Sequence, residues 1–186
     1  TTFTPRPSTD PTASWKTYNV QNAFEIKYPN NLQLNETDMT KSNQLYISYA
    51  TIKISDDSEI RVMVLNPNSY ETPEDYYKKY INGYLGAKKL TISGREAWQS
   101  EPGGNGYFID TVIFKAPNIF EIMYASNNAP SQDDRQLYNQ ILSTFKFTEP
   151  KAGVFCGGIA GVSCPSGYTC KLDGKYPDAG GTCVKN

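Results

Sequence analysis

Segments in which apolar and polar residues alternate make up much of the chain, and such alternation predicts strands with one buried face. In residues 23–28, Phe24, Ile26 and Tyr28 fall on one face, and the two charged residues between them fall on the other. Proline, glycine and asparagine interrupt the segments and predict turns. Residues 32–40 are expected to form a loop. The predicted strands are 15–19, 23–28, 44–55, 60–65, 88–92, 95–100, 107–114, 119–124 and 145–147.

In two segments the apolar residues follow the helical period instead of the two-residue alternation of a strand. Thr72-Pro-Glu-Asp75 supplies an N-cap residue, a proline suited to the first turn, and two acids that complement the helix N-terminus. Ser131 and Asp134 have the spacing of a capping box at a second start. One helical face after each start is apolar or aromatic, which indicates a buried face. These stripes are Tyr76, Tyr77, Tyr80, Ile81 and Tyr84 in the first helix, and Leu137, Tyr138, Ile141, Leu142 and Phe145 in the second.

Runs of antiparallel strands with two helices predict the α+β class, an antiparallel β-sheet flanked by two main helices. Residues 1–13 hold three prolines and five threonines, so we expect an extended linker there. The predicted domain organisation is this linker, an α+β domain at 14–149, and a cysteine-rich module at 150–186.

The order of these elements resembles the PsbP-like superfamily over residues 15–148. The resemblance rests on Phe24-Glu-Ile-Lys-Tyr-Pro29, the helix with Tyr77–Tyr84, the strand Gly94-Arg-Glu-Ala-Trp98, a tyrosine-rich hairpin, and Leu142-Ser-Thr-Phe-Lys-Phe147 at the end. It implies an antiparallel sandwich, an extracytoplasmic location, and a mainly non-catalytic binding or assembly role. Plant members of the superfamily carry metal sites that contain histidine, and this chain has no residue to match them.

Histidine is absent from all 186 residues. Its absence excludes Ser-His-Asp and Cys-His nucleophile arrangements and removes the commonest neutral metal ligand. The 18 basic and 19 acidic residues give a net charge of -1. The composition therefore lacks the excess of positive charge that is typical of proteins that bind nucleic acid or an anionic membrane. No apolar run approaches the roughly 20 residues of a membrane-spanning helix.

All four cysteines lie near the C-terminal end, spaced C-x7-C-x5-C-x12-C. Zinc sites usually bring their ligands as C-x2-4-C pairs, so an even number of cysteines in this Gly/Pro-rich module predicts two disulfides. Three pairings are open. We favour Cys156–Cys170 with Cys164–Cys183, because crossing bonds tie the module together whereas adjacent bonds make two independent loops. A segment of about 30 residues needs such a constraint, since it cannot build a sufficient core.

The stretch from Cys156 to Cys170, with its Cys-Pro-Ser-Gly-Tyr-Thr-Cys end, resembles small cysteine-rich modules of secreted proteins of the Kazal-like and insulin-like-growth-factor-binding-protein type. This resemblance implies protease inhibition as one role for the tail. A stabilising or protein-contact cap is the interpretation that we favour.

No residue outside the cysteines is assigned a catalytic, cofactor-binding or metal-binding role. The acidic stretches Asp56–Glu59 and Asp173–Asp178 could attract calcium but are expected to be solvated turns. Asp110 could be a buried carboxylate with a shifted pKa. Alternation along its strand instead predicts that it faces solvent. Pro102–Gly106 lacks the lysine of a phosphate-binding loop and is expected to be a turn.

The interpretation that we favour is a non-enzymatic, exported or cell-envelope-anchored bacterial protein, extracytoplasmic and without a cofactor. Its partner is an unknown protein or cell-envelope component. The chain begins without methionine, so we expect an export signal or an anchor upstream. This interpretation expects no polar cleft in the main domain. The alternatives are a protease inhibitor or protein-interaction module acting through the tail, and a hydrolase, for which no nucleophile–base arrangement is visible.

Overall fold

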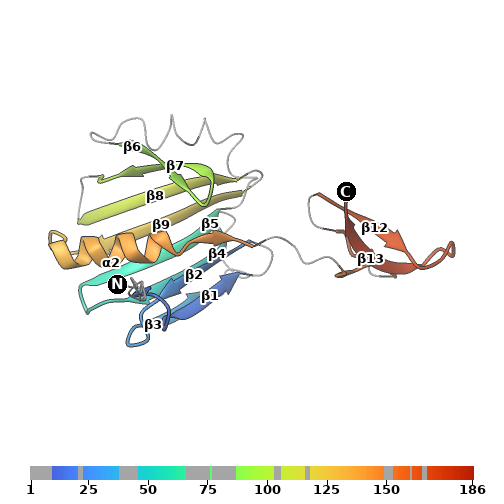
Figure 1. Ribbon diagram of the computed structural model, residues 1–186, viewed down its shortest axis with the longest axis horizontal. Coiled ribbons are helices and arrows are strands. Elements are labelled where there is room, and N and C mark those ends of the chain that lie inside the picture. The colour runs from blue at the N-terminus through green and yellow to red at the C-terminus, as the bar shows by residue number, and fades with distance from the viewer. Residues whose placement is uncertain are drawn as a thin grey trace, which may run out of the picture. The chain divides into compact units, whose positions relative to one another are not determined.

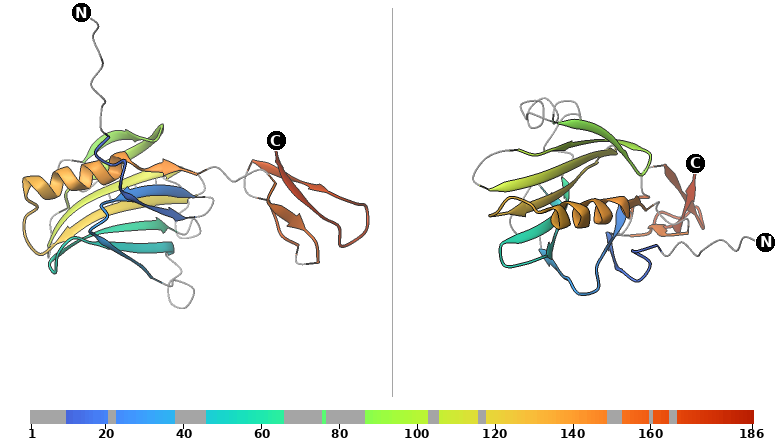
Figure 2. Two further views of the ribbon diagram at one scale, coloured as in Figure 1. Left: turned by 60° about the horizontal axis from the view of Figure 1, so that its bottom comes forward. Right: turned by 60° about the vertical axis from the view of Figure 1, so that its left-hand side comes forward.

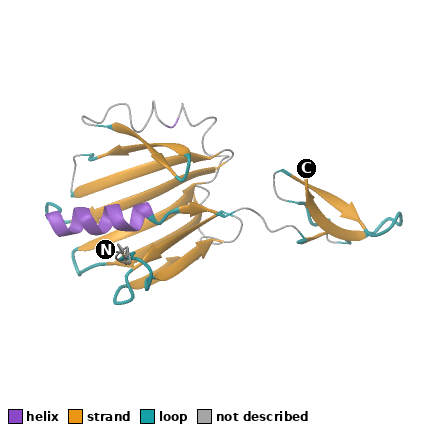
Figure 3. Cartoon of the chain, in the orientation of Figure 1, coloured by secondary structure: helices purple, strands orange, loops and turns teal. Residues whose placement is uncertain are grey.

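The computed structural model describes residues 10–20, 23–37, 46–65, 76, 87–102, 106–115, 118–148, 153–159, 161–164 and 167–186. Strands predominate in these ranges and form one seven-stranded and two three-stranded sheets (Figure 1, Figure 3). By internal contacts the chain divides into two units, Thr1–Tyr18 with Ile26–Phe145, and Asn19–Glu25 with Lys146–Asn186. No helix in the described ranges is long and apolar enough to cross a membrane.

The seven-stranded sheet is antiparallel throughout, in the order β3-β4-β5-β9-β8-β7-β6. The predicted meander over residues 88–124 is confirmed, and β9 then lies against β5, so that a distant hairpin joins the same sheet. The prediction of a loop at residues 32–40 is wrong for residues 33–37. These residues form β3, a polar strand whose backbone pairs with β4. The strands are β3 (Gln33–Thr37), β4 (Tyr46–Lys53), β5 (Ser58–Leu65), β6 (Lys88–Ile92), β7 (Arg95–Ser100), β8 (Tyr107–Lys115) and β9 (Asn118–Ser126).

Helix α2 (Gln132–Ser143) lies along one face of this sheet (Figure 2). The predicted capping box is confirmed: Ser131 Oγ accepts from the Asp134 backbone N–H, and Asp134 accepts from the Ser131 N–H. Tyr138 is fully buried, and its hydroxyl lies 2.7 Å from both Thr111 Oγ1 and the Ile122 carbonyl oxygen. The predicted stripe is therefore the face by which α2 packs on β8 and β9.

A small sheet of order β1-β2-β10 lies beside α2 and consists of β1 (Lys16–Val20), β2 (Phe24–Tyr28) and β10 (Lys146–Phe147). The Lys27 backbone N–H donates to Thr144 Oγ1, at the C-terminal end of α2, over 2.8 Å. The Tyr18 hydroxyl lies 3.3 Å from Ser48 Oγ on β4. Strands β1 and β2 thus cover part of the same face of the seven-stranded sheet as α2.

The predicted α+β class with two main helices is wrong. Strands dominate the described residues, and α2 is the one full helix among them. The physical reason is that alternating apolar residues favour strands, and β1 and β2 bury Tyr18, Phe24 and Ile26 in this form. The helix predicted at 72–84 lies outside the described residues, except for Tyr76, which is helical and buried.

The end of the predicted linker forms a turn. Asp10 Oδ1 accepts hydrogen bonds from the Thr12 backbone N–H at 2.9 Å and from Thr12 Oγ1 at 2.8 Å. Thr12 is buried, and the Ala13 N–H bonds to the Asp10 carbonyl. Residues 10–13 are therefore not extended, while residues 1–9 lie outside the described ranges.

The third sheet is in the tail, in the order β11-β13-β12, with β11 (Phe155–Gly157), β12 (Tyr168–Leu172) and β13 (Gly180–Lys185). Disulfides join Cys156 to Cys170 and Cys164 to Cys183, which is the crossed pairing that we favour from the cysteine order. Cys170 and Cys183 face each other across β12 and β13, yet each bonds to a cysteine from another part of the module.

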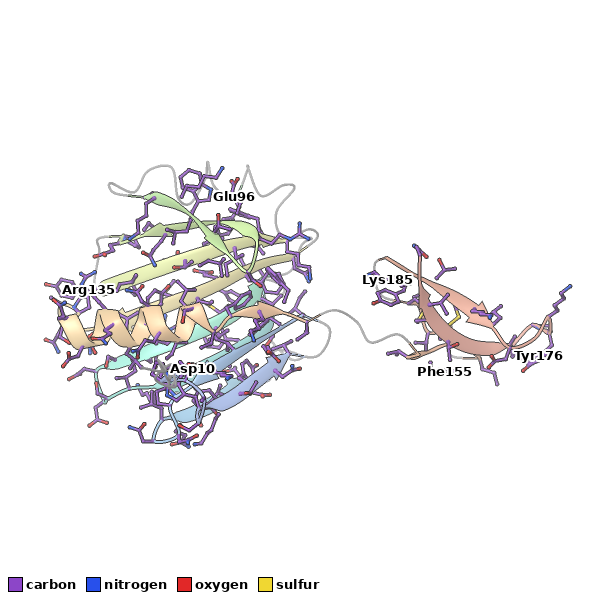
Figure 4. All side chains as sticks on the ribbon, in the orientation of Figure 1. Asp10, Glu96, Arg135, Phe155, Tyr176 and Lys185 are labelled. Carbon is purple, nitrogen blue, oxygen red and sulfur yellow. A yellow bond between two sulfur atoms is a disulfide. The ribbon has the colours of Figure 1, made fainter. Side chains whose placement is uncertain are left out.

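Large apolar side chains of the tail remain exposed. Ile159 is 90% exposed, Phe155 57% and Tyr176 61%. Figure 4 labels Phe155 and Tyr176. Strand packing is close instead: a Cβ on Gly181 would clash with the Lys171 carbonyl oxygen, so this position requires glycine. Cross-links and backbone pairing, more than an apolar core, hold this module together.

Candidate functional site

A tight turn joins β4 to β5 and forms one end of the seven-stranded sheet. The backbone N–H groups of Ile54 and Ser55 both bond to the Ser58 carbonyl, at 3.1 Å. Ser55 Oγ lies 2.7 Å from Ser58 Oγ and accepts from the Asp57 N–H. Serine and aspartate make such local bonds readily, which explains why this sequence turns here.

A polar cavity of about 290 Å³ opens at this end of the sheet. The expectation of no polar cleft in the main domain is therefore wrong. The lining of the cavity combines three acids with two cations and a half-buried aromatic ring. These residues are Lys53, Asp56, Asp57, Glu59, Arg61 and Phe108.

Glu59 links the two cations of the cavity. Its carboxylate lies 2.8 Å from Arg61 Nε and 3.2 Å from Lys53 Nζ. Partial burial opposes ionisation of Glu59, but the hydrogen bonds from Arg61 and Lys53 outweigh it and lower the pKa of this carboxyl group. Glu59 is therefore an ionised bridge between two cations, which makes it a poor proton acceptor.

Asp57 ties the turn to the end of β9. Its carbonyl accepts from the Asn127 backbone N–H at 3.1 Å, and its carboxylate accepts from Asn127 Nδ2 at 3.2 Å. Asp56 is exposed at the same turn. The predicted acidic cluster thus divides its carboxylates among different partners.

That division does not favour a calcium site, which needs several oxygens directed at one point. Among the described residues, the one close group of three metal-type ligands is Cys156, Cys164 and Cys183, whose sulfurs are in the two disulfides. Asp173 and Asp178 are exposed in the tail and belong to no such group.

Asp110 is not exposed to solvent, contrary to the prediction from strand alternation. It is 7% exposed, and its neighbour across the sheet, Glu121, is 6% exposed. Asp110 pairs in register with Met123 on β9, and Glu121 pairs with Val112 on β8. The two acids are therefore diagonal neighbours on one face, within reach of each other's side chains.

The two carboxyl groups hydrogen-bond to each other, and Tyr76 also bonds to Glu121. Burial raises the pKa of Glu121 to about 7, although the bonds from Asp110 and Tyr76 and the charge of Arg61 oppose the rise. Burial and then the neighbouring Glu121 raise the pKa of Asp110 well above its usual range. Asp110 Oδ1 is buried without a hydrogen-bond partner.

The pair and the cavity lie on the same face of the sheet, opposite α2. On β5 and β9, Arg61 pairs with Met123 and Glu121 pairs with Met63, so Arg61 and Glu121 are also diagonal neighbours. Lys53 pairs with Glu59 across β4 and β5. We call the resulting line of five side chains the charged row: Lys53, Glu59, Arg61, Glu121 and Asp110.

Sequence reasoning missed Glu121 altogether and assigned no role to Arg61. The available signal was that Asp110 and Glu121 each interrupt a nearly continuous apolar run. The two runs are Tyr107–Phe114 and Ile119–Tyr124. Such runs are typical of strands covered on both faces. On this face the cover includes Tyr76, which packs with Met63, Leu65, Val112 and Ile119.

Comparison with solved structures identifies the fold. The solution structure of cyanobacterial PsbP (CyanoP) from Synechocystis sp. PCC 6803 matches with a TM-score of 0.51 and 14% identity, covering 73% of this chain and 94% of that one. At this identity the likeness concerns the fold alone, and the chain therefore contains a PsbP-like fold. The Kazal-like or growth-factor-binding character of the tail stays a prediction.

Two further solved structures are more distant. A protein from Bacteroides thetaiotaomicron VPI-5482 matches with a TM-score of 0.47 and 11% identity, over 82% of this chain and 54% of that one. A Pseudomonas aeruginosa protein of unknown function has a TM-score of 0.32 and 12% identity, over 70% and 94% of the two chains. No protein-family model and no curated protein matches the sequence.

Proposed function

We propose that this chain is a non-catalytic, extracytoplasmic binding protein whose PsbP-like domain holds a protein or cell-envelope component at the polar cavity. The observation that carries the proposal is the Lys53–Glu59–Arg61 bridge. It provides fixed charges and hydrogen-bonding groups of both signs around an open space, and it engages the acid that would otherwise be available as a base. Such a lining suits the recognition of a polar group more than its chemical conversion.

The tail supports the proposed location. Disulfides persist in oxidising compartments, and a module of this size without a core depends on them. Two crossed disulfides therefore favour a site of action outside the cytoplasm.

Hydrolysis by paired carboxylates is less well supported. Glycosidase acids stand roughly 5 to 10 Å apart on either side of a cleft. Asp110 and Glu121 instead bond directly to each other and are buried. In the cavity, the pKa of Glu59 is lowered, which is opposite to the direction that a general acid needs.

The test is an NMR titration of the full chain with soluble peptidoglycan fragments, short saccharides and acidic or basic peptides. We expect at least one class to shift the amide signals of Asp57, Ser58 and Asn127. The double substitution Lys53→Gln with Asp56→Asn should abolish these shifts. Asp178→Asn, an exposed acid of the tail, is the matched control and should leave them intact.

Conversion of the added compound into a product would contradict the proposal. So would shifts that centre on the tail and survive the double substitution, because they would place binding away from the cavity.

A second candidate function, protease inhibition by the tail, is favoured by one observation. Ile159 is 90% exposed in a loop between Cys156 and Cys164, and both of these cysteines are disulfide-bonded. Two backbone hydrogen bonds between Gly157 and Val162, of 2.8 and 3.1 Å, close the loop. The loop is a tight turn, whereas a protease cleft usually takes an extended strand, so this function ranks second.

Incubation of the full chain with a panel of serine and cysteine proteases tests this second function. Inhibition that is lost in Ile159→Asp and kept in Tyr176→Ser, a change at another exposed tail residue, would support it. Rapid cleavage within residues 157–162 would exclude it.

A further inference from the structure

The contact between Asp110 and Glu121 requires a proton. An ionised carboxylate only accepts hydrogen bonds, so two carboxyl groups can bond to each other only when one of them is protonated. The side chains meet from diagonal positions on β8 and β9, and both residues are more than nine-tenths buried. Water cannot screen two negative charges there, and the pair therefore holds at least one proton in the folded protein.

The surroundings of the pair point the same way. Among the described residues, Arg61 on β5 is the cation that acts on Glu121, and Tyr76 is its further hydrogen-bond partner. The other titratable groups near the pair, within the described ranges, are tyrosines. They are Tyr46 and Tyr49 on β4, around Arg61 and the pair, and Tyr138 on α2, on the other face of the sheet. One cation can balance one negative charge, and a second charge would have no counterpart in the part of the chain that the structure describes.

We propose that Asp110 and Glu121 form a buried proton-binding site, which exchanges one proton with solvent and transmits its charge to the cavity through Arg61. In the neutral form both carboxyl groups are protonated, and Arg61 is balanced by Glu59 alone. On ionisation the Glu121 proton leaves to water. The new carboxylate then accepts from the Asp110 hydroxyl and from Tyr76, and it attracts Arg61 from the side opposite to Glu59.

The consequence for the cavity follows from the charged row. Arg61 stands between Glu59, two positions away on β5, and Glu121, diagonal to it on β9. A negative Glu121 competes with Glu59 for the same guanidinium group and makes this end of the sheet more negative. This last step rests on the proposed function of the cavity, whereas the proton-binding site itself does not.

The experiment is a carboxyl ¹³C NMR titration of the full chain, labelled at aspartate and glutamate side chains. We expect one carboxyl group to titrate with a midpoint near 7 and a second to stay protonated above that pH. Glu121→Gln should remove the titration near neutrality. Asp110→Asn should retain it, because the amide can still donate to Glu121, and should remove the second protonated signal.

Arg61→Gln tests the link to the cavity. Loss of the positive charge should raise the Glu121 midpoint by roughly half a pH unit or more. Glu36→Gln, at an exposed acid on β3, is the matched control and should leave the midpoint unchanged.

Ionisation of both carboxyl groups below about pH 5, as for ordinary acids, would overturn the proton-binding site. An unchanged midpoint in Arg61→Gln would overturn the link to the cavity. No ligand enters these measurements, so their failure is distinguishable from failure of the proposed binding function, which the Lys53→Gln and Asp56→Asn double substitution tests.

Discussion

Arg61 Nε lies 2.8 Å from Glu59 Oε1, two residues earlier on β5 and on the same face of the sheet. Strand geometry produces this contact directly, since residues i and i+2 point to the same side. Glu59 also reaches Lys53 on β4, so a single carboxylate organises both cations at the cavity. Glu59 therefore determines how the charges of Lys53 and Arg61 are neutralised at the cavity.

Glu59→Gln should change the charge of the cavity with little effect on stability. Partly exposed ion pairs contribute about 0–1 kcal/mol, so the free energy of unfolding should fall by no more than that. With Lys53 and Arg61 no longer neutralised, binding of sulfate or phosphate at the cavity should increase, as measured by NMR titration. Glu36→Gln serves as the control. Equal anion binding in both variants would show that Glu59 does not govern the cavity charge.

Stability of the main domain should depend on pH because of Glu121. Its pKa is about 7 in the folded protein against an ordinary 4.5, so the folded state holds the proton more tightly than the unfolded state. The stabilisation is fully present below pH 4.5 and is lost as the pH rises through about 7. The loss amounts to a few kcal/mol, because each tenfold difference in proton affinity between the two states corresponds to about 1.4 kcal/mol.

Urea unfolding at several pH values measures this loss, with Glu121→Gln as the comparison. The variant should show a flatter dependence between about pH 5 and about pH 8. Parallel curves for the two proteins would mean that another group dominates.

Tyr138→Phe should destabilise the packing of α2 on the sheet. The Tyr138 hydroxyl bonds to the Ile122 carbonyl and Thr111 Oγ1, and Gln99 Nε2 donates to the same threonine at 3.1 Å. Removing the buried hydroxyl takes one hydrogen-bond partner from each of Ile122 and Thr111, at a cost of about 1–3 kcal/mol. Thermal unfolding checks this value. Tyr107→Phe, at a residue 48% exposed, should have no measurable effect.

Replacing Cys164 and Cys183 together by serine should unfold the tail. A cross-link of this loop size stabilises by about 3 kcal/mol through the unfolded chain, and the module has little apolar burial to replace it. Amide hydrogen exchange should become fast in residues 153–186 and stay slow in β5, β8 and β9, which contain no cysteine. Retained protection in the tail would show that backbone pairing is sufficient without this bond.

Local features of this protein were open to prediction from its sequence. Alternation identified most strands, and the Ser131–Asp134 box marks the start of α2. The cysteine order favoured the crossed pairing that the tail contains. Each of these features depends on residues close together in the chain, where steric preference and local hydrogen bonding decide the outcome.

The tertiary structure decided the rest. The polar strand β3 forms because its backbone pairs with β4. No alternating apolar pattern in residues 33–37 predicts this strand. Pairing of β5 with β9 completes the sheet and aligns the charged row across four strands. Alternation shows which residues share a face, but whether that face meets water depends on what packs over it. Asp110 and Glu121 are buried, and so share a proton, because distant parts of the chain cover them.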